Sequence, residues 1–105
     1  MTKAIKSRKP VDGPTACRAF GKAVRALRNN TGLSQEEFAF QCGIERAHMN
    51  TIEMGRCNLS LEIMMRLLPT LVVTFGELAA MVDRFLPAKH RQRHKRPPQA
   101  MALSS

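Results

Sequence analysis

The stretch of residues 35–52 constrains the fold more than any other part of the chain. It reads QEEFAFQCGIERAHMNTI, with the small residues Ala39 and Gly43 on either side of one bend. Ala39 leaves room for a second helix to cross, and Gly43 can adopt the positive φ that such a turn often needs. The sequence therefore predicts two short helices that meet at a sharp turn.

The second of these helices should present a polar surface. Its apolar residues, Met49 and Ile52, belong on the inner side together with residues of the preceding helix. The polar side chains are then left facing outward: Arg46, His48, Asn50 and Thr51. A helix held in this way can enter the major groove of DNA.

Start and stop signals predict the helices around this turn. A first helix should occupy about residues 15–30, because its apolar residues repeat every three or four positions. Ser34 can cap the second helix and Glu37 can complete a capping box, with Leu33 packing onto Phe38. The third helix should occupy roughly residues 45–54.

Two further helices are expected after Ser60. Pro69 should kink the fourth helix or end it early, and Thr74 with Glu77 forms a second capping box that starts a fifth helix ending near residue 86. We expect these helices to turn the following residues inward: Leu61, Met64, Met65, Leu68 and Leu71 on the fourth, and Phe75, Leu78, Val82 and Phe85 on the fifth. No strand-like alternation appears, so the predicted fold class is all-α.

The charge is concentrated at the ends of the chain. The formal net charge is +9, but residues 16–86 are almost neutral. We therefore divide the chain into a flexible basic arm (1–14), one folded domain (15–86) and a basic, disordered tail (87–105). The arms fit two interpretations equally well: they bind DNA phosphates or the minor groove, or they are merely solvated.

Several other functions are not expected. Cys17, Cys42 and Cys57 share no CxxC spacing, which argues against a disulfide framework or metal cluster and for reduced thiols in a cytoplasm. His90 and His94 are interpreted as solvated. The chain shows no catalytic set, no cofactor motif, no secretion signal and no apolar run long enough to span a membrane, so we expect a cytoplasmic protein that is not an enzyme.

Beyond these patterns, the segment FGKAVRALRNNTGLSQEEFAFQCGIERAHMNTIEMGRCNLSLEIMMRLLPTLVVTFGEL resembles the phage-repressor-like (lambda-repressor-like, Xre-type) helix-turn-helix family. The match covers residues 20–85, with residues 25–28, 31–37, 52–55 and 58–62 all at the family's spacings. The resemblance implies a compact bundle of five helices. Val72, where the family has Gly, and Leu59, where it often has Pro, depart from the pattern.

The resemblance also implies roles for individual residues. Gln35 would bind a phosphate or the first base, and base edges would be read by Arg46, Ala47 and Thr51, with Asn50 and His48 able to reach a base or a phosphate. Arg46 is the strongest candidate, because a guanidinium can bind guanine O6 and N7 together. The DNA backbone would be contacted by Lys22, Arg56 and Asn58, besides His48. Arg28 and Glu53 would form a structural ion pair between the first and third helices.

The sequence thus favours a sequence-specific, double-stranded DNA-binding transcriptional regulator. We expect a repressor that binds a palindromic operator as a homodimer, with the fifth helix, Val72, Val73 and Met81 as candidates for the dimer face. Two alternatives remain at this stage. One is an antitoxin that binds a protein toxin and regulates its own gene, and the other is a non-specific nucleic-acid binder that works through its basic arms.

Overall fold

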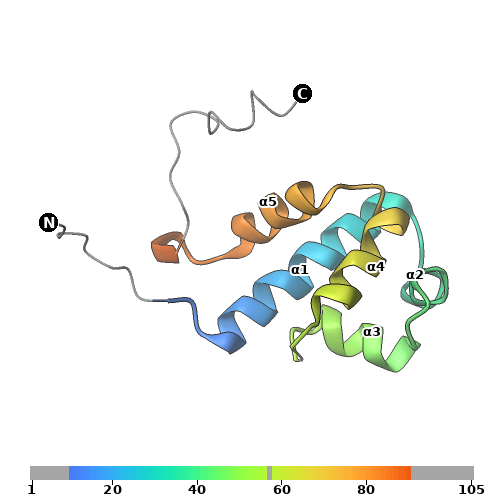
Figure 1. Cartoon of the computed structure of the whole chain (residues 1–105), viewed down its shortest axis with the longest axis horizontal. Helices are drawn as coiled ribbons and strands as arrows, with labels where there is room; N and C mark the ends of the chain where they lie inside the picture. The colour runs from blue at the N-terminus through green and yellow to red at the C-terminus, as the bar shows by residue number, and fades with distance from the viewer. Residues whose placement is uncertain (1–9, 57, 91–105) are drawn as a thin grey trace, which may run out of the picture.

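The computed structural model describes residues 10–56 and 58–90 of the 105-residue chain. Their regular structure is entirely helical (Figure 1), which confirms the all-α prediction. The elements are α1 (Gly13–Thr31), α2 (Gln35–Cys42), α3 (Arg46–Glu53), α4 (Leu61–Leu71), α5 (Phe75–Phe85) and a 3-10 turn, η1 (Ala88–His90).

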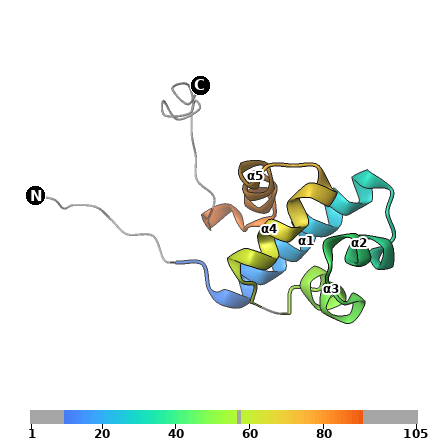
Figure 2. The same cartoon turned by 45° about the vertical axis from the view of Figure 1, so that its right-hand side comes forward.

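The long helix α1 is the centre of the bundle. It contacts α3, α4 and α5, while α2 packs against α3 and α4. Figures 1 and 2 both show α5 on one side of α1 and α3 on the other. The core between them is made of the following buried residues: Ala23, Val24, Leu27, Phe38, Ala39, Cys42, Ile44, Met49, Ile52, Leu67, Leu71 and Leu78.

The helix starts follow the capping signals in the sequence. Ser34, Ser60 and Thr74 each accept a hydrogen bond from the backbone N–H three residues later, and α2 and α5 have complete capping boxes. The start of α1 was placed two residues too late. Asp12 caps this helix by accepting from the Thr15 N–H at 2.7 Å, so Gly13 and Pro14 are already helical. Residues 1–9 and 91–105, with most of the two arms, lie outside the described part.

Pro69 lies inside α4 and does not end it at once, while the kink expected there stays a prediction. The helix continues to Leu71, and the backbone N–H of Val72 donates to the carbonyls of Leu68 and Pro69. Pro69 lies in the last turn, where it removes a single donor. The backbone N–H of Val72 then caps the end of the helix.

The predicted inner faces of α4 and α5 are wider than the faces that are buried. Leu67, Leu71 and Leu78 are buried, but four residues expected to point inward are exposed: Leu61, Met65, Phe75 and Phe85. Only some of the apolar positions on each helix are covered by its neighbours, which are α1, α2 and α5 for α4, and α1 and α4 for α5. The apolar residues at the edges of each apolar face therefore remain at the surface. Met65 is one of them, although its spacing suggested a core position.

Three further expectations concerned the cysteines, metal sites and membrane-spanning helices. Cys17 and Cys42 are free thiols, burial raises the pKa of Cys42, and Cys57 lies outside the described residues. Among residues 10–56 and 58–90, no group of three His, Cys, Asp or Glu side chains could hold a metal ion. In the same residues no single helix could cross a membrane by its length and apolar character; only α4 and α5 taken together reach that threshold, with a 100° bend between them.

Candidate nucleic-acid interface

The turn between α2 and α3 is built around Gly43. Its φ is +71°, and a Cβ there would meet no atom within 4 Å, so the backbone conformation and not crowding favours glycine. The N–H of Ile44 donates to the Ala39 carbonyl at 2.9 Å, which closes the turn. Ala39, Cys42 and Ile44 are buried beneath it. The bend predicted from the sequence is therefore present and packed.

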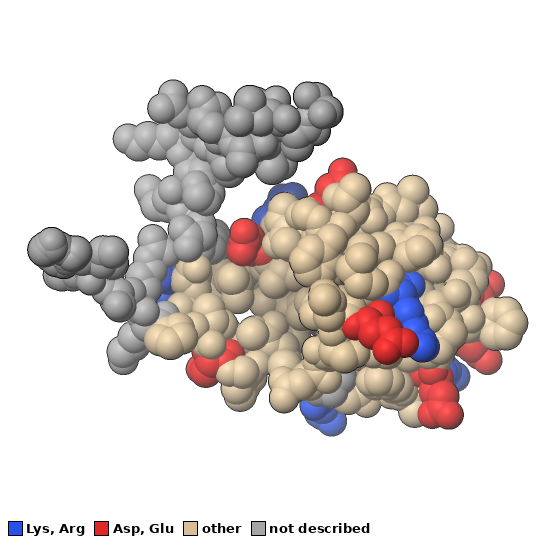
Figure 3. All heavy atoms as spheres, viewed as in Figure 1, with Lys and Arg blue, Asp and Glu red and all other residues tan. Residues whose placement is uncertain are grey.

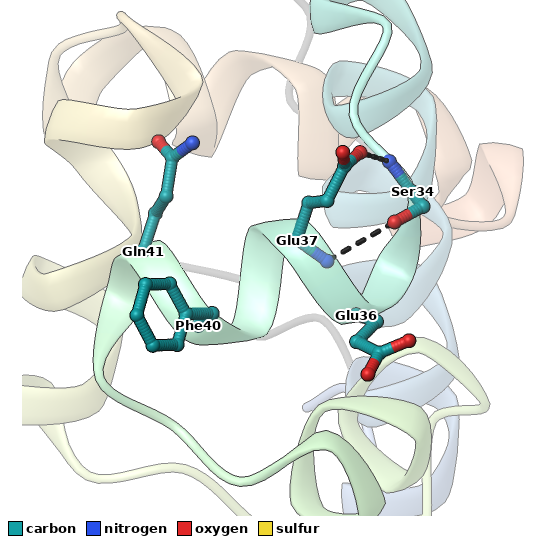
Figure 4. Close-up of a pocket in the computed structure, with 5 residues that line it drawn as sticks. All are labelled: Ser34, Glu36, Glu37, Phe40 and Gln41. Carbon is teal, nitrogen blue, oxygen red and sulfur yellow. Dashed lines mark hydrogen bonds between the residues drawn. The ribbon is translucent and has the colours of Figure 1, made fainter.

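The start of α2 is fixed by its capping box (Figure 4). The Ser34 N–H donates to Glu37 at 2.8 Å, and the Glu37 N–H donates to the Ser34 hydroxyl at 3.0 Å. The backbone hydrogen bond from Ser34 lowers the pKa of Glu37, so the carboxylate keeps this cap at neutral pH and loses it only when the pH falls through that lowered pKa. This cap sets the position of Gln35, the first residue of α2.

Helix α3 has one buried apolar side and one exposed polar side. Met49 and Ile52 are buried, while Arg46, Ala47 and His48 are exposed at its N-terminal end. Glu45 is the N-cap residue but makes no side-chain cap hydrogen bond. Asn50 is exposed as well. This end of the helix is therefore open to an external partner, as a helix that enters a DNA groove must be.

Arg28 and Glu53 hold α3 against α1. The Arg28 Nε donates to Glu53 Oε2 at 2.7 Å and its Nη2 donates to Oε1 at 3.0 Å, and only 11% and 3% of the two side chains are exposed. Arg28 also donates to the Leu33 carbonyl at 3.0 Å. Because this buried ion pair has two hydrogen bonds, it fixes both the orientation of α3 relative to α1 and the distance between the two helices.

Gln35 joins this ion pair to the outer face of α3. Its Nε2 donates to Glu53 Oε1 at 3.2 Å and to Asn50 Oδ1 at 3.3 Å. The amide of Gln35 is therefore used inside the protein. Thr51 is also engaged, since its hydroxyl donates to the Ala47 carbonyl at 3.0 Å. Of the five predicted base-reading residues, Arg46 and Ala47 have side chains without such an internal hydrogen bond in the described residues.

The residues predicted to contact the DNA backbone lie on neighbouring elements. Lys22 is exposed on α1, and Arg56 and Asn58 are exposed in the segment between α3 and α4, where Asn58 Oδ1 accepts from the Cys17 thiol at 3.4 Å. Arg18 and Arg25 are exposed on α1 at four and three residues from Lys22, which places the three cations on one side of the helix.

Comparison with known proteins identifies this arrangement. A family model described as a helix-turn-helix domain matches residues 19–82. The chain belongs to this family. The resemblance to Xre-type helix-turn-helix proteins is thereby confirmed, and the chain is a DNA-binding helix-turn-helix transcription regulator, a class in which no enzymatic activity is indicated.

Similar proteins include controller proteins. C.MunI, a control protein from a Mycoplasma species, is 35% identical over 66 residues, which are 62% of this chain and 89% of C.MunI. The structure of the restriction-modification controller protein C.AhdI from Aeromonas hydrophila has a TM-score of 0.57 and 37% identity, covering 59% of this chain and 94% of C.AhdI. The clp gene regulator ClgR from C. glutamicum (TM-score 0.66, 20% identity, 78% of this chain and 100% of ClgR) shares the fold.

Sequence reasoning missed two features of this helix-turn-helix surface. It singled out Lys22 but not Arg18 and Arg25, although their spacing along α1 was visible in the sequence. It also assigned Gln35 to the DNA and did not anticipate its hydrogen bonds to Asn50 and Glu53. The capping, glycine and periodicity signals used for the fold act within a few residues, so they do not show these bonds.

Proposed function

We propose that the chain is a sequence-specific, double-stranded DNA-binding regulator that reads its site with the N-terminal half of α3. The observation that carries this proposal is the exposure of Arg46, Ala47 and His48 on a helix whose other side is fixed by Met49 and Ile52. A guanidinium at the exposed end of a held helix can donate to both acceptors of a guanine in the major groove.

Replacement of Arg46 by alanine tests the proposal. The selected DNA site should be bound about 5- to 150-fold more weakly, and the preference for guanine at one position of each half-site should be lost. Selection from random duplexes followed by titration of the enriched site measures both effects. Arg46→Lys is the matched control, because it keeps the charge but not the two-pronged geometry and should lose the preference while retaining most non-specific binding. If wild type enriches no sequence at moderate salt, the proposal fails.

We further infer that the protein binds as a homodimer to inverted half-sites. In the orientation of Figure 1, α4 lies toward the viewer, and most of that face carries neither acidic nor basic side chains (Figure 3). The exposed apolar residues of α4, α5 and the turn between them are Leu61, Met65, Val72, Phe75 and Phe85. Val73 and Met81, which the sequence also suggested, are partly buried and pack against the core. Two copies would place their α3 helices about 34 Å apart, one turn of DNA.

Val72 is the best position to test this dimer. It is 81% exposed and has a φ of +60°, a conformation that is strained by about 1 to 2 kcal/mol in an L-residue and especially unfavourable for a β-branched one. Val72→Asn should relieve the strain and raise the unfolding free energy of the monomer by about 1 kcal/mol. The same change should raise the dimer dissociation constant about tenfold, because an apolar contact is lost. Sedimentation and dilute-solution melting measure the two effects, and an unchanged dissociation constant would place Val72 outside the interface.

The regulated genes are proposed to be those of a restriction-modification system, with the dimer acting as a repressor at a palindromic operator. The support is the likeness to C.MunI and C.AhdI, a control protein and a restriction-modification controller protein. A footprint upstream of the chain's own gene, in a cluster with an endonuclease and a methyltransferase, is the expected result. A neighbouring toxin gene would instead favour the antitoxin alternative.

A further inference from the structure

Four side chains form a continuous hydrogen-bonded path from the inside of the protein to the outer face of α3. The path runs from Arg28 on α1 to Glu53 on α3, then to Gln35 at the start of α2, and finally to Asn50 on α3. Its links are 2.7 and 3.0 Å at the ion pair, 3.2 Å at the second step and 3.3 Å at the third.

The chemistry of the first two residues fixes the orientation of the last two. A guanidinium can only donate and a carboxylate can only accept, so Glu53 offers only oxygen to its second neighbour. Gln35 must therefore turn its NH₂ group, and not its carbonyl, toward Glu53. The same NH₂ group reaches Asn50, which must then present its Oδ1 as the acceptor. The directions of both amides, which distance alone does not distinguish, are dictated by the buried carboxylate.

The outward group of Asn50 is consequently its NH₂. Asn50 is exposed, and its Nδ2 has one other contact, the sulfur of Met54 at 3.4 Å. A thioether is a weak acceptor that a base or phosphate oxygen can replace. Asn50 therefore approaches an external partner as a donor.

We propose that Asn50 determines specificity as a hydrogen-bond donor, selecting at its contact position a base that offers an acceptor in the major groove: guanine, with O6 and N7, adenine, with N7, or thymine, with O4. Cytosine presents a donor there and is rejected. Adenine is accepted because its N7 can accept from Nδ2, and the second lone pair of Oδ1 stays available for the adenine N6 group beside the bond from Gln35. This inference rests on the proposed function and adds which base edge the protein reads.

Asn50→Asp is the decisive variant. It keeps an oxygen for Gln35 but replaces the outward NH₂ by a carboxylate oxygen, so the outward group changes from donor to acceptor and one negative charge is added. Wild type should exclude cytosine and enrich guanine, adenine or thymine at one position of each half-site. The variant should bind that site about 5- to 150-fold more weakly and should select cytosine there, whose amino group can donate to the new oxygen.

Two further variants complete the experiment. Gln35→Met removes the donor that holds Asn50, so the Asn50 amide can turn its oxygen outward, and cytosine should become accepted at the same position. Gln41→Glu, at an exposed position near the end of α2, makes the same change from amide to carboxylate away from this path and controls for the added negative charge. Selection from random duplexes is carried out on all four proteins, with circular dichroism to show that each is folded.

The possible results separate the two proposals. If wild type enriches no sequence, the proposed function fails. If wild type enriches a sequence and Asn50→Asp selects the same base at every position, with no more loss of affinity than Gln41→Glu, then Asn50 is not a specificity determinant. A wild-type preference for cytosine at the position that changes in Asn50→Asp would also overturn the inference.

Discussion

Replacement of Arg28 by methionine should lower the free energy of unfolding by about 3 to 5 kcal/mol. The substitution leaves the Glu53 carboxylate, with 3% of its side chain exposed, without its charge partner. Within residues 10–56 and 58–90, the Gln35 amide is then its one remaining side-chain donor. It also removes the donor to the Leu33 carbonyl. For a domain of this size the melting temperature should fall by about 15 °C or more, as measured by calorimetry or circular dichroism.

The control for this prediction is the second ion pair of the described residues. Arg66 donates to Glu62 at 2.9 Å, but 45% and 74% of these side chains are exposed. Arg66→Met should therefore lower the unfolding free energy by less than about 1 kcal/mol. If the two methionine variants are equally stable, the pair between Arg28 and Glu53 is not the link that holds α3 on α1.

Gly55→Ala should lower the unfolding free energy by about 3 kcal/mol. Gly55 follows α3 with a φ of +73°, and a Cβ there would lie 2.6 Å from the Arg18 Cα and 3.0 Å from the Cys17 carbonyl oxygen. The unfavourable φ contributes about 1 kcal/mol and the clash with backbone atoms of α1, which cannot rotate away, adds about 2 kcal/mol. Denaturant unfolding measures the sum.

Gly32→Ala separates these two contributions. Gly32 has a φ of +81° at the end of α1, but a Cβ there would meet nothing within 4 Å. It should therefore lose only the conformational part, about 1 kcal/mol. Equal losses at Gly32 and Gly55 would show that α1 does not pack closely against the segment after α3.

The sequence predicted most of the fold because its signals are local. Ser34, Ser60 and Thr74 lie directly before apolar periods and cap the helices that they were expected to cap. The positive φ of Gly43 was likewise readable from residue type and position. The local signals were less accurate at the start of α1 and around Pro69. In both places the exact helix end depends on which groups accept or donate the terminal backbone hydrogen bonds.

The burial of α4 and α5 could not be predicted in the same way. Phe75 and Leu78 both belong to the apolar side of α5, yet Leu78 is buried and Phe75 is exposed. Periodicity shows which side of a helix is apolar. How many residues of that side are buried depends on how the helix packs against its neighbours.

The candidate site also has a part that the sequence predicts and a part that depends on tertiary packing. The sequence by itself determined the all-helical bundle, the turn at Gly43 and the residues available on α3, because capping, glycine conformation and apolar spacing act within a few residues. Only the tertiary structure decided how those residues are used. It brought Gln35 of α2 between Asn50 and Glu53 of α3, beside Arg28 of α1, and the fixed hydrogen-bonding capacity of each group then determined the direction in which Asn50 faces.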